Sequence, residues 1–193
     1  MLFVCIGNIC RSPMAERLLI HAVRERAGDE AAALIVSESV GTGSWHIGEP
    51  MNPPAADELR RRGVSAEGFR ARKLAAGHID TADLILVATS EQLESVEGLR
   101  PDAMSRSFVL GEFARLIAHV DADGLPPAKL TPEAVHARGI ALVAAVDAER
   151  DGAGPLPNDD LDDPWGRGDK VFRGTADRIA SWQEPLVRLL FAG

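Results

Sequence analysis

Short apolar runs alternate along the chain with stretches in which apolar residues recur every three or four positions. The short runs have the length and composition of strands buried in a sheet, and they cover residues 2–4, 34–40, 84–88 and 107–110. The remaining pattern predicts helices that begin near residue 12, over 53–62, over 91–97, from 113, from 131 to about 146 and over 169–190. Strands and helices that alternate in this way are typical of an α/β fold, with a parallel sheet and helices on both faces.

Capping and breaking residues predict where two of these helices begin and end. Ser12 is expected near the N-cap of the first helix, and Pro13 in its first turn, where the missing proline N–H does no harm. Gly28 is expected to end that helix. Thr131 and Pro132 are the expected cap and first turn of a later helix.

Composition narrows the class of protein. The chain has 193 residues, 46% apolar and 26% charged, as expected for one globular domain. Its net charge of −8 argues against general binding to nucleic acids or anionic membranes. Arg11 interrupts the N-terminal apolar run, so no signal peptide is expected, and no run has transmembrane length. Two cysteines are too few for a disulfide scaffold and favour the cytoplasm, with secretion by a route that needs no signal peptide left open.

The N-terminal sequence MLFVCIGNICRSP places a cysteine between a predicted strand and a predicted helix. A cysteine attacks as its thiolate, and backbone N–H groups at a helix N-terminus stabilise a thiolate and also bind a tetrahedral oxyanion. Gly7 lets the backbone approach such an anion, and Asn8 tolerates a left-handed turn. Arg11 offers a planar fork for two phosphate oxygens, and the Ser12 hydroxyl can donate to the Cys5 sulfur. The C-x5-R-S pattern therefore predicts a phosphate-binding loop with Cys5 as nucleophile.

Structural and metal-binding interpretations of these and other residues are weaker. Cys5 could be a small buried hydrophobe and Arg11 a surface charge, but their position between strand and helix disfavours this. The acidic stretch NDDLDD lacks the spacing and the glycine of an EF-hand loop, and the five histidines show no metal-ligand spacing. No metal or cofactor is therefore predicted.

Three stretches of the sequence resemble one protein family. CIGNICRSPMAE is similar to the active-site loop of the low-molecular-weight protein tyrosine phosphatases, SVGTGSWHIG to their S-A-G-T…W-H-x-G segment, and DPWG to the loop that carries their general acid. The resemblance covers residues 1–75 well and 160–190 moderately. It implies one domain over residues 1–193 with a three-layer α/β fold. In that fold, a four-stranded parallel sheet has helices on both faces and a phosphate-binding loop after the first strand.

The resemblance also implies catalytic roles. Cys5 would attack phosphorus and form a phosphocysteine, and Arg11 would bind the equatorial phosphate oxygens. Asp163 would protonate the leaving oxygen and then activate water, with Asp162 as the alternative acid. On composition alone Asp163 would be a solvated charge in an acidic loop. Its position directly before Pro164, which favours an extended backbone, and the family match favour the catalytic role.

Further residues are implied to support the loop and to wall the pocket. Asn8 and Ser39 are expected to hydrogen-bond each other and hold the loop in shape. The residues expected to bind phosphate or support the loop are Ile6, Gly7, Asn8, Ile9, Cys10, Ser12 and Ser39, and those expected to wall the substrate pocket are Ile9, Trp45 and Trp165. His46 matches a family position and is expected to be structural. Cys10 is either a redox partner that forms a reversible disulfide with Cys5 or a buried neutral thiol.

The sequence also departs from the family pattern. It is longer before the general-acid loop, which predicts a helical insertion at about 114–158 that could act as a lid, a dimer surface or a docking helix. Thr89 and Ser90 stand where the family commonly has Met-Asp, so a supporting hydrogen-bond network can differ. The chain has no tyrosine, and Trp165 and Gly166 replace the family's tyrosines beside the acid.

Three functions are open at this point. The favoured one is a phosphomonoester hydrolase, a protein-tyrosine-phosphatase that acts on a phosphotyrosine-containing protein or a small aryl phosphate, in bacteria opposite a tyrosine kinase. An arsenate reductase would need an external small thiol, because Cys5 and Cys10 are the only cysteines. A non-catalytic phosphate-sensing or docking protein would not need a general acid, so Asp163 argues against it. The physiological substrate and the oligomeric state are left open.

Overall fold

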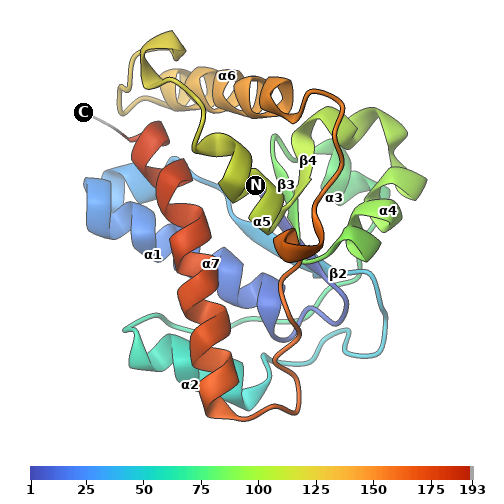
Figure 1. Ribbon diagram of the computed structural model, residues 1–193. Helices are drawn as coiled ribbons and strands as arrows, with labels where there is room; N and C mark the ends of the chain where they lie inside the picture. Colours follow the sequence, from blue (N-terminus) through green and yellow to red (C-terminus); the bar gives the residue numbers. More distant parts are fainter. Residues whose placement is uncertain (192–193) are drawn as a thin grey trace.

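Four parallel strands form the centre of the computed structural model, which describes residues 1–191 (Figure 1). They are β1 (Leu2–Cys5), β2 (Glu38–Gly41), β3 (Ile85–Val87) and β4 (Ser107–Val109), in the order β2-β1-β3-β4 across the sheet. β1 pairs with β2 from Leu2 opposite Glu38 to Cys5 opposite Gly41, so both strands end together at the carboxyl edge of the sheet. The predicted four-stranded parallel sheet is confirmed.

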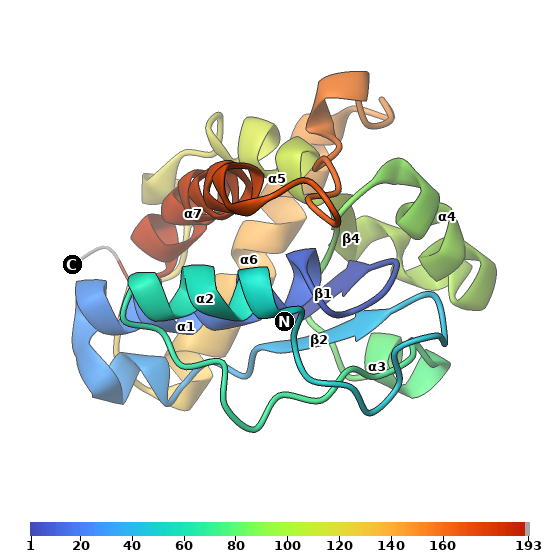
Figure 2. The same cartoon turned by 90° about the horizontal axis from the view of Figure 1, so that it is seen from below.

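Helices connect the strands and cover both faces of the sheet. They are α1 (Arg11–Ala32), α2 (Pro53–Arg61), α3 (Ala76–Asp80), α4 (Ser90–Leu99), α5 (Leu110–Ile117), α6 (Pro132–Arg150) and α7 (Asp169–Leu190). Short 3-10 turns lie at Pro101–Arg106, Ala122–Gly124 and Pro157–Asp159. Figure 2 shows α3 on one side of the sheet and α5 and α7 on the other, which is the three-layer arrangement expected.

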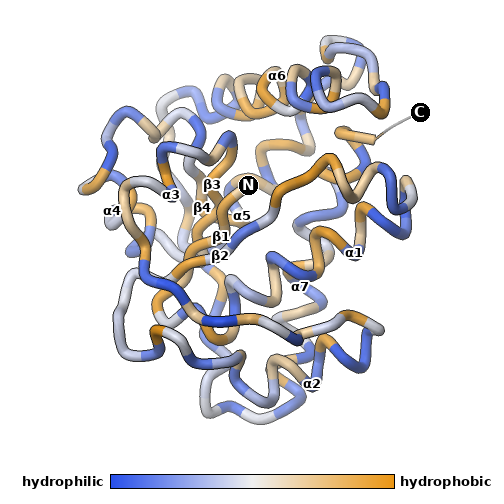
Figure 3. The backbone as a smooth tube through the Cα atoms, turned by 180° about the vertical axis from the view of Figure 1, so that it is seen from behind, coloured by the Kyte–Doolittle hydropathy of each residue, from blue (hydrophilic) through white to orange (hydrophobic). Residues whose placement is uncertain are grey.

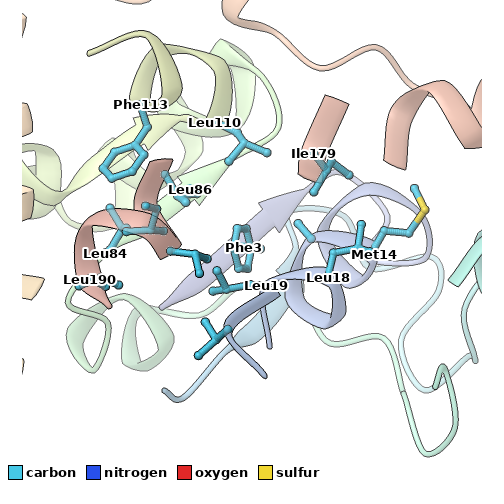
Figure 4. Close-up of a cluster of buried hydrophobic side chains, with 14 of the residues drawn as sticks. Phe3, Met14, Leu18, Leu19, Leu84, Leu86, Leu110, Phe113, Ile179 and Leu190 are labelled. Atoms are coloured by element: carbon cyan, nitrogen blue, oxygen red, sulfur yellow. The ribbon is translucent and has the colours of Figure 1, made fainter. Parts of the chain in front are cut away.

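Alternate residues of the strands build two separate cores, because successive side chains of a strand point to opposite faces. Phe3, Leu86 and Phe108 pack against α1, α5, α6 and α7 in the larger core, part of which is drawn in Figure 4. Val4 and Val87, one position along, belong to the smaller core that α3 and α4 cover. The strands are therefore apolar on both faces, and Figure 3 shows them as the mainly hydrophobic centre of the molecule.

The chain between the first helix and β2 differs from the prediction in one respect. Gly28, with φ +86°, breaks α1 where its end was predicted, and a short further helical stretch runs on to Ala32. The apolar run from Leu34 does not begin a strand, because the N–H groups of Leu34 and Ile35 donate back to the last helical turn. β2 therefore starts only at Glu38.

α6 lies in the region where a helical insertion is predicted, at the top of the molecule in Figure 1. The Thr131 hydroxyl accepts from the Ala134 N–H at 3.3 Å, which confirms the predicted cap. Leu142 and Val146 are fully buried in the larger core, so α6 packs onto the domain along one face. We expect residues 1–193 to behave as one domain.

Within residues 1–191, no helix combines the length and the apolar character that crossing a membrane would require.

Candidate active site

The phosphate-binding loop begins where β1 ends and finishes where α1 begins. Cys5 is the last residue of β1 and is only 2% exposed. Its sulfur lies 3.0 Å from the Ser12 hydroxyl and accepts from the Asn8 N–H at 3.2 Å. Both contacts, together with the N-terminus of α1, stabilise a thiolate at this position.

Asn8 is the residue that holds the loop in shape. Its φ of +53° is left-handed, as its residue type predicts. Its side-chain amide nitrogen donates to the hydroxyls of Ser12 and Ser39, both at 2.9 Å, and its amide oxygen accepts from the Arg72 N–H at 2.7 Å. The expected hydrogen bond between Asn8 and Ser39 is thus present.

Two groups that support the loop were not predicted from the sequence. One is the backbone N–H of Arg72, whose place beside Asn8 only the folded chain reveals. The other is Gly41 at the end of β2, where a Cβ atom would lie 2.8 Å from the carbonyl oxygen of Ile6 and would push the loop away. The glycine stands inside the SVGTG motif, so its position was a signal that could have been used.

Arg11 connects the loop to the segment that precedes α7. Arg11 is 5% exposed, and its two terminal nitrogens donate to the Leu161 carbonyl at 2.9 Å and to the Asp163 carboxylate at 2.7 Å. Its Nε is buried and has no hydrogen-bond partner within residues 1–191. No described protein group therefore uses this N–H.

Asp163 faces this guanidinium from a half-exposed position, with 44% of its side chain accessible. Its second carboxylate oxygen accepts from the Trp165 N–H at 3.1 Å. Asp162, the alternative acid, is exposed and does not line the pocket that contains Cys5. Of the two carboxyls, Asp163 is the one that lines the pocket together with Cys5.

A pocket of about 200 Å³ lies over the cysteine. Its lining residues are Cys5, Ile6, Gly7, Ile9, Cys10, Arg11, Trp45, His46, Asp163 and Trp165. Ile9 is buried, whereas Trp45 and Trp165 are 68% and 63% exposed, so the two indoles form its rim. His46, expected to be structural, also reaches the pocket, and its Nδ1 lies 2.6 Å from the Glu49 carboxylate.

Cys10 lines the same pocket, but its thiol is a poor nucleophile. Burial, and next the nearby Cys5, raise the pKa of its thiol to about 12. Cys10 is therefore a neutral thiol at physiological pH, and both cysteines are free in the structure. A disulfide between Cys5 and Cys10 stays a prediction, and it would require Cys5 to be the sulfur that reacts first.

Similarity to known proteins agrees with this geometry. Residues 1–138 match the family described as low molecular weight phosphotyrosine protein phosphatase. The chain belongs to this family. It is therefore a cysteine-dependent enzyme of the protein-tyrosine-phosphatase class. The match ends before Asp163, so the place of the acid loop is known from the structure rather than from the family match.

Individual relatives match this phosphatase over about 100 residues. A low molecular weight phosphotyrosine protein phosphatase of Schizosaccharomyces pombe is 37% identical over 114 residues, 58% of this chain and 71% of the relative. The protein-tyrosine-phosphatase YfkJ of Bacillus subtilis is 39% identical over 98 residues, 51% of this chain and 61% of the relative.

Solved structures extend the similarity of the fold to nearly the whole chain. The structure of YfkJ superimposes with a TM-score of 0.63 at 26% identity, covering 96% of this phosphatase and 89% of YfkJ. The tyrosine phosphatase Wzb from Escherichia coli K30, solved with sulphate, superimposes with a TM-score of 0.65 at 19% identity and covers 97% and 94% of the two chains.

Proposed function

We propose that this phosphatase hydrolyses aryl phosphate monoesters through a phosphocysteine on Cys5, with Arg11 as phosphate ligand and Asp163 as general acid and base. One observation carries the assignment of these roles. Cys5 and Arg11 come from the N-terminal loop and Asp163 from the far end of the chain, yet the three side chains line one small pocket. Arg11 and Asp163 are in direct contact at 2.7 Å.

In the first step, the Cys5 thiolate attacks phosphorus and the bond from phosphorus to the aryl oxygen breaks. Asp163 gives its proton to that oxygen, so a neutral phenol leaves. Arg11 and the loop N–H groups bind the remaining phosphate oxygens, whose charge they stabilise in the transition state.

In the second step, water attacks the phosphocysteine and the bond from phosphorus to sulfur breaks. The Asp163 carboxylate accepts a proton from the water, and Cys5 leaves as a thiolate. The Ser12 hydroxyl and the Asn8 N–H, already in contact with the sulfur, stabilise that leaving group. Inorganic phosphate is the second product.

The contact between Arg11 and Asp163 changes during this cycle. Asp163 has to be protonated for the first step, and a neutral carboxyl binds a guanidinium less strongly than a carboxylate does. Substrate phosphate takes over the guanidinium, using the Nε that has no protein partner within residues 1–191. The exchange leaves the carboxyl next to the leaving oxygen.

The pocket favours an aromatic leaving group. Ile9, Trp45 and Trp165 offer apolar and aromatic surface for a phenyl ring above the phosphate site. Phosphotyrosine in a protein is the substrate class we propose, and in a bacterial cell the product of a tyrosine kinase is its natural source. The net charge of −8 does not favour nucleic acid as a substrate. We place the enzyme in the cytoplasm, where cysteine thiols stay reduced.

The first test is turnover of p-nitrophenyl phosphate at mildly acidic pH in the presence of a metal chelator. We expect steady turnover by the wild type and none above background with Cys5→Ser, because the oxygen nucleophile is poorly activated. Asp163→Ala should lower kcat/KM by roughly 100-fold or more with phenyl phosphate, the usual contribution of a general acid, and by less with p-nitrophenyl phosphate, whose leaving group needs a proton less.

Asp162→Ala separates the two neighbouring carboxyls, and we expect it to keep nearly full activity because its side chain lies outside the pocket. A large loss with Asp162→Ala and a small one with Asp163→Ala would reverse the assignment of the acid. Turnover that survives Cys5→Ser would remove the phosphocysteine mechanism altogether.

A further inference from the structure

The segment between α6 and α7 contains Asp163. It runs from the top of the molecule down to the start of α7 (Figure 1). It has no helix or strand of its own beyond one 3-10 turn at Pro157–Asp159. A segment of this kind keeps a catalytic group in place only if its neighbours hold it.

Three consecutive residues attach this segment to the body of the domain. Asp159 is buried and accepts from the Arg115 guanidinium of α5 at 2.8 Å. The next residue, Asp160, bonds to Ser90. The Leu161 N–H donates to the Ala88 carbonyl, just after β3, at 2.8 Å.

Of the two attachments made by side chains, the bond between Asp160 and Ser90 is the one nearer to Asp163 along the chain. One carboxylate oxygen of Asp160 accepts both the Ser90 N–H at 2.8 Å and the Ser90 hydroxyl at 2.9 Å. Ser90 is the first residue of α4, so its N–H has no partner within the helix and the helix dipole favours a negative group there. Asp160 does not line the catalytic pocket.

From this attachment the chain leads directly to two catalytic groups. The carbonyl of Leu161, the next residue, accepts from the Arg11 guanidinium at 2.9 Å. Asp163 follows two residues later and contacts the other terminal nitrogen of the same guanidinium. Three residues span at most about 11 Å, so a shift at Asp160 is passed on to Asp163.

We infer that Asp160, bonded to Ser90, is a positioning residue for catalysis: it keeps Asp163 within reach of the leaving oxygen. The inference rests on the proposed role of Asp163. Loss of the attachment changes no active-site side chain, but it lets Asp163 move. A displacement of about 1 Å can cost on the order of 100-fold in rate.

Two aryl phosphates with different leaving groups reveal such a displacement. Phenol is a weak acid with a pKa of about 10, as for tyrosine, so phenolate leaves poorly without a proton from Asp163. p-Nitrophenol is a much stronger acid, and its anion leaves with less help. The value of kcat/KM reports the first step, in which Asp163 acts as acid.

Asp160→Ala is expected to lower kcat/KM about tenfold or more for phenyl phosphate and only about twofold for p-nitrophenyl phosphate. Asp160→Asn should restore both values, because the amide oxygen can accept the same two hydrogen bonds from Ser90. Ser90→Ala keeps the N–H and loses the hydroxyl, so its effect should be smaller and of the same kind. In an Asp163→Ala background, Asp160→Ala should no longer discriminate between the two substrates.

The matched controls are Ser95→Ala, a serine further along α4, and Glu149→Ala, an exposed carboxylate near the end of α6. Both should behave like the wild type. Thermal unfolding of every variant shows whether it is folded. If Asp160→Ala does not fold, Ser90→Ala takes its place in the comparison of the two substrates.

An equal loss with both substrates, or no loss, would overturn the positioning role while leaving the proposed function intact. A discriminating loss with Asp160→Asn as large as with Asp160→Ala would overturn it as well, because the hydrogen bonds would then not be the cause. Failure of the proposed function looks different, since the wild type would be inactive or Cys5→Ser active.

Discussion

At the scale of single residues, the phosphate-binding loop depends on Asn8, which has two structural roles. Asn8 adopts a left-handed backbone that most residues avoid, and its amide group bonds to α1, to β2 and to the segment between α2 and α3. The left-handed geometry could be predicted from the residue type and its neighbour Gly7. The bond to the Arg72 N–H could not, because no pattern in the sequence shows that residue 72 returns to the loop.

We expect the two roles of Asn8 to separate in a pair of variants. Asn8→Gly tolerates the positive φ but loses all three hydrogen bonds, whereas Asn8→Ala loses the bonds and also carries the left-handed strain of about 1 kcal/mol. Both should lower kcat/KM at least about tenfold, since the loop no longer holds its N–H groups around the phosphate. Urea unfolding should place Asn8→Ala below Asn8→Gly in stability.

Ser65→Ala, an exposed serine outside the loop, is the control for this pair and should match the wild type. If Asn8→Gly kept wild-type kcat/KM, backbone geometry alone would explain the residue. Equal stability of the two variants would remove the strain from the account.

At the scale of elements, hydrophobic periodicity was a good guide to which helices and strands exist and a poor one to their ends. The strands at residues 85–87 and 107–109 and the helix capped by Thr131 were predicted within a few residues. α3 was not predicted, because Ala76–Asp80 is too short to show a helical period. β2 was predicted too early, because an apolar run also serves a turn that packs against a helix.

The contacts between elements were the part that periodicity could not supply. Arg150, the last residue of α6, has no motif around it, yet its guanidinium lies 4.1 Å from the ring centre of Phe108 and bonds to Glu112 at 3.0 Å. Glu112 is 1% exposed, and burial raises the pKa of its carboxyl although the charge of Arg150 opposes the shift. This ion pair joins the end of α6 to the start of α5.

Removing Arg150 should therefore destabilise the protein in a pH-dependent way. Arg150→Met leaves Glu112 buried without its cation, which should cost about 3 kcal/mol at pH 8 by urea unfolding. The folded-state pKa of Glu112 is raised above its unfolded value, so protonation stabilises the fold at low pH and that contribution is lost as the pH rises. The deficit of Arg150→Met should accordingly be smaller at pH 5 than at pH 8.

Adding Glu112→Gln to Arg150→Met should recover much of the loss at pH 8, because a neutral amide can still accept from the Val109 N–H. Arg188→Met is the control, since Arg188 is half-exposed and its contact with Glu184 is 3.7 Å long. A deficit that is the same at both pH values would show that packing on Phe108, and not the charge of Glu112, explains the role of Arg150.

At the scale of the whole molecule, parallel topology accounts for the active site. Parallel strands bring their carboxyl ends to one edge, so the loop after β1, the residues after β3 and the returning acid loop meet there. The sequence motifs named the chemical groups, and the resemblance gave their order along the chain. Only the fold shows that the connection containing α6 brings Asp163 to the same edge.

The same packing predicts that α6 unfolds together with the active site. Leu142 is fully buried in the core shared with α1, α5 and α7, so Leu142→Ala should cost about 2–5 kcal/mol. Ile140 lies on the same helix and is 43% exposed, so Ile140→Ala should lower the free energy of unfolding far less. Circular dichroism reports the helices. In a Trp182→Phe background, the fluorescence of Trp45 and Trp165 reports the pocket. In urea both signals should change at one midpoint that Leu142→Ala lowers equally. Loss of helical signal before the pocket signal would instead make α6 an independently unfolding attachment, and the single-domain interpretation would then be wrong.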